Sequence, residues 1–282
     1  MRPNASTAAR PAVIRTAVIP AAGFGTRMLP ATRAVPKELL PVGTQPAIQW
    51  AVDEAVAAGI ERCVIVSSLR KPSIEAYFEE QDPHDCAIEI VNQPTAAGLG
   101  DAIQTARGAF GNDPVAVLLP DEVLLGGARL LRAMLDDFTR TGCSNVSVMP
   151  VAREEIGAYG CADLTPRPGA DLSYDIVACV EKPTLDDAPS SFALSGRYVL
   201  GPDVLDALGR VRRDPRGEVQ LTDALDAVAR TRGLVGIEVL PSDGRVDVGN
   251  WDGWLEANNR LLRHGSIARD HDARREWIAI SG

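Results

Sequence analysis

The sequence is poor in the residues on which several classes of active site depend. It contains three histidines and five cysteines, and no Cys-x-x-Cys pair occurs. It shows neither a His spacing typical of a metal site nor a Ser/His/Asp arrangement. The sequence therefore disfavours covalent and histidine-based catalysis.

Long apolar runs are also missing. No window approaches the ~18 apolar residues of a membrane span, and the first fifteen residues carry three arginines without the apolar core of a secretory signal. We expect a disordered tail over residues 1–15, no membrane partner and a cytoplasmic location. The odd number of cysteines suits a reducing compartment, and Cys63 and Cys179, which lie in apolar runs, are predicted to be buried thiols.

The composition is that of an ordinary globular chain with an excess of acids. The 282 residues are 45% hydrophobic and 24% charged, which suits one large domain or two closely packed ones. The net charge of −9 and the pI near 4.9 argue against a nucleic-acid partner. A polyphosphate ligand would need a local group of Lys and Arg side chains and a divalent metal.

Apolar runs alternate with amphipathic patterns in the first half of the chain. Strands are predicted over 16–20, 62–67, 87–92, 115–119 and 145–151, and helices over 46–59, 72–80, 98–110 and 130–142. Strands that are apolar on both faces indicate a mostly parallel sheet covered by helices on both faces. The predicted fold is a Rossmann-like α/β fold, whose ligand crevice lies beyond the carboxyl ends of the strands.

From about residue 152 the pattern is irregular and indicates a second, smaller lobe. Strands are predicted over 176–180 and 197–200, and helices over 222–232 and 250–264. The last helix has one stripe, which predicts that its tryptophans face the core rather than stack on a ligand. The stripe consists of Trp251, Trp254, Leu255, Asn258, Leu261 and Leu262.

A loop of small residues follows the first strand and reads Ala21-Ala22-Gly23-Phe24-Gly25-Thr26-Arg27. Glycines let backbone N–H groups approach an anion closely, and arginine adds charge-assisted hydrogen bonds. Ten residues further on, Pro36-Lys37-Glu38 supplies a second cation that can reach the same phosphates. Together these residues indicate a site for a nucleoside triphosphate.

Other glycine-loop sites fit less well. Met28 stands where a dinucleotide-binding loop needs its third glycine, and prolines at 30, 36 and 41 interrupt the helix that would follow. The acidic ribose partner is missing, as is any Gly-x4-Gly-Lys-Ser/Thr string. Gly-x-Gly alone would suit a plain turn, but Arg27 and Lys37 favour a phosphate site.

One further segment supplies groups that suit a nucleotide base. Gln93 leaves a predicted strand, and its amide offers a donor and an acceptor side by side, which suits the edge of a pyrimidine base. Gly98 would let the ring approach the backbone. A helix N-cap turn is an equal alternative for this segment.

Two carboxylates are candidates for a metal site. Asp121 ends the fourth strand, and Asp247 precedes the last helix. Magnesium prefers one or two carboxylates together with waters and phosphate oxygens. Capping of a turn or of the helix is the alternative role for each of them.

Glu181 and Lys182 end a strand that Pro183 stops. The glutamate can accept hydrogen bonds from sugar hydroxyls, and the lysine can neutralise a phosphate. The turn at Gly160 is compatible with a sugar packed against the backbone. A charged surface turn and a simple loop are the alternatives.

The ordered set of motifs resembles the bacterial UTP–glucose-1-phosphate uridylyltransferases. The motifs are Ala21 to Thr32, Pro36-Lys37-Glu38-Leu39-Leu40-Pro41, Gln93 to Gly98, Leu119-Pro120-Asp121, Ala158-Tyr159-Gly160, Glu181-Lys182-Pro183, Gly196-Arg197-Tyr198, Glu218 to Asp223 and Asp247 to Asn250. They extend over residues 16–263. Related thymidylyltransferases usually carry Ser-Lys-Gln where this chain has Pro-Lys-Glu, and the family usually has Asp-Asp or Asp-Val where it has Asp121-Glu122.

The resemblance implies a role for each motif. The nucleotide would contact Ala22, Gly23, Gly25 and Thr26, the triphosphate Arg27 and Lys37, the uracil Gln93 and Gly98, and Mg²⁺ Asp121 and Asp247. Glucose would contact Gly160 and Glu181, and its phosphate Lys182. Catalysis would rest on Arg27, Lys37 and Lys182.

The resemblance also implies the reaction and the organisation of the chain. The sugar phosphate would attack the α-phosphorus of UTP in line, releasing pyrophosphate and forming UDP-glucose. We expect a nucleotide half over 16–151, a sugar-binding half over 152–263, and a tail over 264–282 that contributes to a homodimer or homotetramer. The alternatives are use of dTTP or another sugar 1-phosphate, and a non-catalytic paralogue that binds nucleotide sugars.

Overall fold

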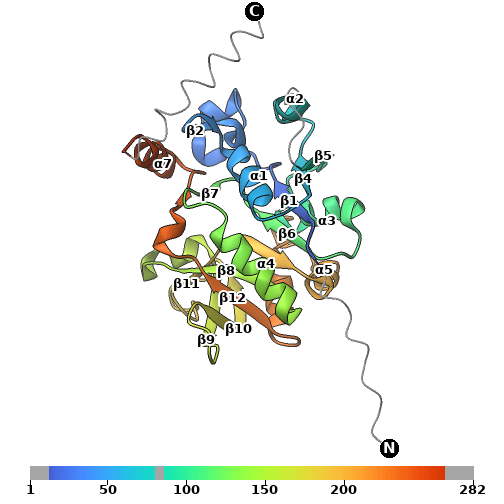
Figure 1. Ribbon diagram of the computed structural model, residues 1–282, viewed down its shortest axis with the longest axis vertical. Coiled ribbons are helices and arrows are strands. Elements are labelled where there is room, and N and C mark those ends of the chain that lie inside the picture. The colour runs from blue at the N-terminus through green and yellow to red at the C-terminus, as the bar shows by residue number, and fades with distance from the viewer. Residues whose placement is uncertain (1–12, 80–85, 264–282) are drawn as a thin grey trace, which may run out of the picture.

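A nine-stranded mixed sheet forms the centre of the computed structural model, which describes residues 13–79 and 86–263 (Figure 1). Its strands, in spatial order, are β5 (Ala87–Asn92), β4 (Arg62–Ser67), β1 (Thr16–Pro20), β6 (Val115–Leu118), β11 (Phe192–Leu200), β8 (Asn145–Pro150), β12 (Leu234–Glu238), β10 (Ser173–Glu181) and β9 (Gly160–Pro166). All of these strands except β10 and β11 run in one direction. The predicted α/β fold is confirmed.

Helices cover both faces of the sheet, as the apolar strands require. The helices are α1 (Ala47–Ala57), α2 (Pro72–Glu79), α3 (Leu99–Phe110), α4 (Arg129–Thr141), α5 (Pro202–Leu208), α6 (Leu221–Ala229) and α7 (Trp251–Arg263). In β1, Ala17 and Ile19 face a core formed with α1, α2 and α4, whereas Val18 faces a core formed with α3, α5 and α6. This alternation is the period of two that a strand imposes.

Two small hairpin-like pairs lie outside the main sheet. Strand β7 (Glu122–Leu124) pairs with β13 (Arg245–Asp247), and β2 (Pro41–Val42) pairs with β3 (Gln45–Pro46). Helix α7 packs on both pairs through a third core. Since β13 follows β12 and β7 follows β6, the first pair joins the end of the chain to its middle.

The far end of the sheet closes on itself. Strand β9 pairs with β10 along its length and also with β11 at Ala193 and Cys161, so β11, β8, β12, β10 and β9 form a ring. The predicted second lobe therefore continues the first sheet instead of forming a separate layer. Strand β11 lies between β6 and β8, which both belong to the predicted nucleotide half.

Most strands and helices of the first half agree with the prediction, and the main omissions lie in the second. The predicted elements at 16–20, 62–67 and 87–92 match β1, β4 and β5. The short strands β7, β9, β12 and β13 and helix α5 were not predicted. Strand β9 carries polar residues because only part of it is buried, so it shows no continuous apolar run.

Three predictions about burial can be compared with the structure. Cys63 and Cys179 are buried free thiols, as predicted. The stripe on α7 was wrong in part, because Trp251, Leu255 and Leu262 are exposed and only one edge of the stripe packs inward. The predicted tails lie outside the described residues at 1–12 and 264–282, whereas Ile14 is already part of the core.

A buried ion pair joins β11 to α1. The guanidinium of Arg197 contacts both carboxylate oxygens of Glu54, with distances of 2.6 to 3.1 Å, and both side chains are almost fully buried. The same guanidinium donates to the carbonyl oxygens of Leu119 (3.1 Å) and Glu122 (2.8 Å). It therefore fixes both ends of the turn that contains Asp121.

Removing one partner of this pair is expected to destabilise the protein strongly. Glu54→Ala leaves an uncompensated buried guanidinium, so the free energy of unfolding should fall by about 3–5 kcal/mol in a denaturant titration at neutral pH. Glu61→Ala, which breaks an exposed pair with Arg15, is the control and should change it by about 1 kcal/mol or less. Similar losses in the two variants would contradict a structural role for the buried pair.

Candidate active site

The glycine loop after β1 presents unpaired backbone donors. Within the described residues, the N–H groups of residues 22–25 donate to no protein acceptor. Gly25 has a φ of +65°, and a Cβ there would stand 3.0 Å from Thr32 Cγ2. The hydroxyl of Thr32 donates to the Gly25 carbonyl oxygen at 2.9 Å and holds the loop in this shape. A row of free N–H groups in a glycine loop is a suitable anion site.

No continuous helix follows the loop, as the prolines predicted. The chain instead makes three short 3₁₀ turns, η1 (Thr26–Met28), η2 (Ala31–Arg33) and η3 (Lys37–Leu39). Met28 is fully buried, so the position that is glycine in a dinucleotide-binding loop serves here as a core residue. These turns bring Lys37 back toward Arg27.

A buried lysine–glutamate pair holds the glycine loop in place. Lys71, which precedes α2, donates to the Ala21 carbonyl oxygen and to Glu38 Oε2, both at 2.7 Å. Burial raises the pKa of Glu38 and lowers the pKa of Lys71, and their attraction opposes both shifts. The pair thus ties the glycine loop to the turn that carries Lys37.

Two cations and two carboxylates meet at the carboxyl end of β6. Lys37 Nζ lies 2.5 Å from Asp121 Oδ2, and the guanidinium of Arg27 lies 3.7 Å from Asp121 Oδ2 and 3.5 Å from Asp247 Oδ2. The pairing of β7 with β13 brings the two aspartates together, and Val248 N donates to the Asp121 carbonyl oxygen at 2.7 Å. The side chains of Arg27, Lys37, Asp121 and Asp247 therefore form one cluster, as predicted.

Their electrostatics keep this group charged. Burial would raise the pKa of Asp121, but Lys37 and Arg27 outweigh it and lower that pKa below its ordinary value. Burial would likewise lower the pKa of Lys37, yet Asp121 and Glu38 raise it. At neutral pH the site holds an ionised carboxylate beside a protonated amine.

The donor set fits a divalent ion bound together with phosphate. Asp121 and Asp247 already converge on one cationic group, the Arg27 guanidinium. Among the residues that the structure describes, no group of three or more His, Cys, Asp or Glu side chains could hold a metal. Two carboxylates completed by phosphate oxygens and waters are the set that magnesium prefers.

A second group of predicted residues lies where β9 meets β10. Gly160 is paired with Glu181, and a Cβ at Gly160 would stand 3.3 Å from Glu181 Oε2. Lys182 Nζ lies 3.6 Å from Glu181 Oε1, and its backbone has a φ of +44°. Thr222 donates to Glu181 Oε2 at 2.6 Å and so fixes that carboxylate. Non-glycine residues in the left-handed region concentrate at functional sites.

Strand β11 places the two groups side by side. A Cβ at Gly160 would stand 3.0 Å from Leu194 Cδ1, and one at Gly196 would stand 3.0 Å from Leu119 Cβ, beside the turn that carries Asp121. Leu194 and Gly196 are two residues apart in one strand, about 6.6 Å. The ring of strands thus brings Gly160 and Glu181 to the carboxyl end of β6.

A polar network also spans this distance. Glu122 Oε2 accepts hydrogen bonds from Ser195 (2.6 Å) and from Arg245 Nε (2.8 Å), and the Arg245 guanidinium lies 6.0 Å from the centre of the Tyr159 ring. Lys182 N donates to the Tyr159 carbonyl oxygen at 3.1 Å. The glutamate that differs from the family pattern therefore links the turn that carries Asp121 to the segment before Gly160.

The remaining predicted pair lies at the end of β5. Gln93 is 3% exposed, and its amide donates to Asp101 at 2.6 Å. Gly98 has a φ of +93°, and a Cβ there would stand 2.8 Å from the Val219 carbonyl oxygen. Both the backbone conformation and the close approach therefore require glycine at this position.

Pattern reasoning missed Lys71, Thr222 and Asp101. The chain contains only three lysines, Lys37, Lys71 and Lys182, and all three lie in or beside this site. That scarcity was a usable signal for Lys71. Thr222 lies in a motif to which no role was given, and nothing in the sequence pairs Asp101 with Gln93.

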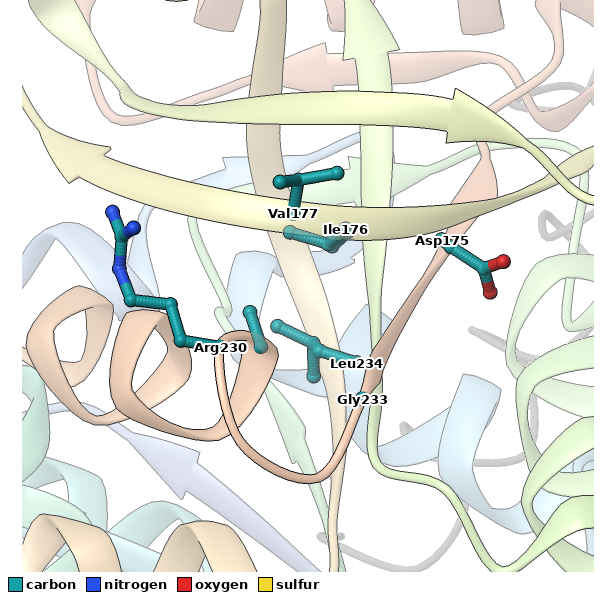
Figure 2. Close-up of a pocket in the computed structure, with 7 residues that line it drawn as sticks. Asp175, Ile176, Val177, Arg230, Gly233 and Leu234 are labelled. Carbon is teal, nitrogen blue, oxygen red and sulfur yellow. The ribbon is translucent and has the colours of Figure 1, made fainter.

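The pocket shown in Figure 2 lies away from the predicted site residues. Figure 2 shows a pocket of about 550 Å³ between β10 and the end of α6, lined by Asp175, Ile176, Val177, Arg230 and Leu234 among others. None of the predicted site residues lines it. The convergence of charged side chains at the carboxyl end of β6 is the stronger indication of function.

Sequence comparison identifies the family of the chain. The family model for nucleotidyl transferases matches residues 16–264. A protein of Streptococcus pneumoniae serotype 4 named UTP–glucose-1-phosphate uridylyltransferase is 35% identical over 283 residues, covering 91% of this chain and 93% of that protein. A Staphylococcus saprophyticus protein named UTP–glucose-1-phosphate uridylyltransferase 1 is 40% identical over 234 residues, covering 76% and 81%.

Solved structures give the same relationship. A UDP-glucose pyrophosphorylase complexed with UDP-glucose matches with a TM-score of 0.82 and 34% identity, covering 89% of this chain and 99% of that chain. A UTP-bound UGPase from Acinetobacter baumannii matches with a TM-score of 0.80 and 31% identity, covering 92% and 98%. With its sequence and fold in agreement, this chain belongs to the nucleotidyl transferase family.

Proposed function

We propose that this protein transfers a uridylyl group from UTP to glucose 1-phosphate, forming UDP-glucose and pyrophosphate. The observation that carries the proposal is the convergence of Arg27, Lys37, Asp121 and Asp247 beside a glycine loop with free N–H groups. The names of the relatives and the ligands of the matching structures support UTP and UDP-glucose as the nucleotides.

Each predicted residue has a role in this proposal. The nucleotide contacts Ala22, Gly23, Gly25 and Thr26; Arg27 and Lys37 bind the triphosphate; Gln93 and Gly98 face the uracil; Gly160, Glu181 and Lys182 bind glucose 1-phosphate. The Thr222 hydroxyl orients Glu181. Nucleotidyl transferases of this family generally use a divalent metal, and we assign Mg²⁺ to Asp121 and Asp247.

The reaction needs alignment and charge neutralisation more than a chemical group from the protein. An oxygen of the sugar phosphate attacks the α-phosphorus of UTP, a new P–O bond forms, and the bond to the β-phosphate breaks to release pyrophosphate. Lys182 orients the attacking phosphate, while Arg27 and Lys37 hold the triphosphate and neutralise the leaving group. Bound Mg²⁺ would neutralise additional phosphate charge.

Few observations bear on the partners and the location of this protein. In the described parts of the chain, no helix is both long and apolar enough to cross a membrane. The five free cysteines are consistent with the predicted cytoplasmic location. The homodimer or homotetramer and the division into halves at residue 151 stay predictions.

The direct test is release of pyrophosphate from UTP, glucose 1-phosphate and Mg²⁺, compared with dTTP and with other sugar 1-phosphates. We expect UTP and glucose 1-phosphate to be preferred, and Asp121→Asn to abolish turnover because it weakens both the metal site and the pair with Lys37. Asp171→Asn, in an exposed turn, is the matched control. Preference for dTTP, or near-normal activity of Asp121→Asn, would contradict the proposal.

Lys182→Ala is expected to affect the sugar phosphate rather than the nucleotide. Loss of one charged phosphate contact costs about 2–4 kcal/mol in the transition state, so kcat/KM for glucose 1-phosphate should fall by about 30- to 1000-fold. UTP affinity, measured by equilibrium binding, should change by less than about threefold. Lys182→Arg retains the charge and should recover part of the activity, whereas an equal loss of UTP affinity would place Lys182 on the nucleotide instead.

Lys37→Met is expected to destabilise the protein more at neutral pH than in acid. In the wild type the cations lower the pKa of Asp121, so its ionised form adds stability that is lost only as the pH falls through that lowered value. Without Lys37, burial raises the pKa of Asp121. Ionising this carboxyl then costs more in the folded protein than in the unfolded chain, so stability falls as the pH rises. The substitution should therefore lower the free energy of unfolding by about 1 kcal/mol more at pH 7 than at pH 4. Denaturant titrations at both pH values measure it; equal losses would contradict the coupling.

A further inference from the structure

The side-chain amide of Gln93 is held in one orientation by an aspartate. Gln93 Nε2 donates to Asp101 Oδ2 at 2.6 Å, and the other oxygen of Asp101 accepts from Arg213 Nη2 at 2.7 Å. Gln93 is 3% exposed and the Asp101 side chain 15% exposed. The carboxylate is therefore used at both oxygens in a partly dehydrated place.

This contact forbids the flipped amide. A carboxylate paired with a guanidinium has only acceptor oxygens, so the group of Gln93 that faces it must be the donor nitrogen. Rotating the amide by half a turn would set Gln93 Oε1 against Asp101 Oδ2, two acceptors at hydrogen-bond distance. Burial makes such an unsatisfied contact costly.

The fixed Gln93 amide leaves its oxygen and one of its two N–H hydrogens available to a ligand. Among the described residues, Gln93 Oε1 accepts no hydrogen bond, and it is not one of the buried unpaired atoms. One hydrogen of Nε2 goes to Asp101, and the second remains beside Oε1. The hydrogen bond to Asp101 thus fixes the positions of the acceptor and the donor that Gln93 presents.

The loop between α5 and α6 keeps this arrangement in place. Val219 N donates to the Ala97 carbonyl oxygen at 2.8 Å, and Gly100 N donates to the Val219 carbonyl oxygen at 3.0 Å. Arg213, from the same loop, adds its contact with Asp101 and a second one to the Gly217 carbonyl oxygen at 2.7 Å. The loop is fastened to the start of α3 on both sides of Gly98.

Uracil and cytosine differ in the order of the same two groups. Uracil offers the N3–H donor next to the O4 acceptor, which matches an amide that presents its oxygen and one hydrogen. Cytosine offers the N3 acceptor next to the N4 amino donor and would need the flipped amide. We propose that the Asp101 carboxylate positions Gln93 so that the base site selects uracil over cytosine. This inference rests on the proposed function, in which Gln93 faces the base.

The test compares UTP with CTP in the same variant, so that differences in folding or expression cancel. Asn at position 101 can accept or donate and permits both orientations of Gln93. For Asp101→Asn we expect the ratio of kcat/KM for UTP to that for CTP to fall at least tenfold below the wild-type ratio. An unchanged ratio would overturn the inference, whatever happens to the absolute rates.

Arg213→Ala is the matched control, because it removes the same ion pair but leaves the Asp101 carboxylate in place. Its UTP-to-CTP ratio should stay within about threefold of the wild type; a fall as large as that of Asp101→Asn would overturn the role of the carboxylate. The ratio of UTP and CTP affinities, from equilibrium binding with Mg²⁺, provides a readout that needs no turnover. Absence of wild-type turnover with normal UTP selectivity in binding would contradict the proposed function and leave this inference supported.

Discussion

The buried guanidinium of Arg197 organises the active-site edge of this protein. It comes from β11, a strand that runs against most of its neighbours, and it contacts Glu54 on α1 and the carbonyl oxygens on both sides of Asp121. A charge without water needs such a complete set of partners. Because each partner belongs to a different element, helix, sheet and metal-side turn must keep their relative positions for the guanidinium to be satisfied.

The same constraint explains how the group around Glu181 and the group around Asp121 come to lie side by side. Strand β11 contacts the turn before Asp121 through Gly196 and the start of β9 through Leu194. Closing the ring of strands at Ala193 and Cys161 is what brings Gly160 and Glu181 to this edge. In an open sheet with the same strand order, β9 would be the strand furthest from β5 and remote from β6.

The candidate active site combines a high density of charge with side chains that are already held in position. Arg27 lies against both aspartates and Lys37 against Asp121, and the two cations lower the pKa of Asp121, so that carboxylate stays ionised. Lys71 and Glu38 hold the backbone beneath them. Preorganised charges of this kind stabilise a transition state without first having to reorient. At the end of β5, the hydrogen bond to Asp101 likewise fixes the orientation of the Gln93 amide.

The sequence by itself determined the part of the fold that depends on local pattern. Apolar runs marked β1 and β4 because a strand buried on both faces admits few polar residues, and the loop of small residues predicted a phosphate site. The same reasoning predicted that Arg27, Lys37, Asp121 and Asp247 belong together, and the structure confirms their proximity. It failed where an element is half-exposed, as for β9, and where apolar residues on α7 stay exposed.

Tertiary structure alone decided the insertion of β11 between β6 and β8, the closure of the ring and the contacts made by Arg197, Lys71 and Asp101. These features join residues that are far apart in the chain, and no local preference specifies them. A hydrogen bond between Gln93 and Asp101 further depends on side-chain direction, which follows only once the strand, the turn and the helix have been packed. The physical reason is that periodicity reports which face of an element is buried, whereas partnership across elements depends on their arrangement in space.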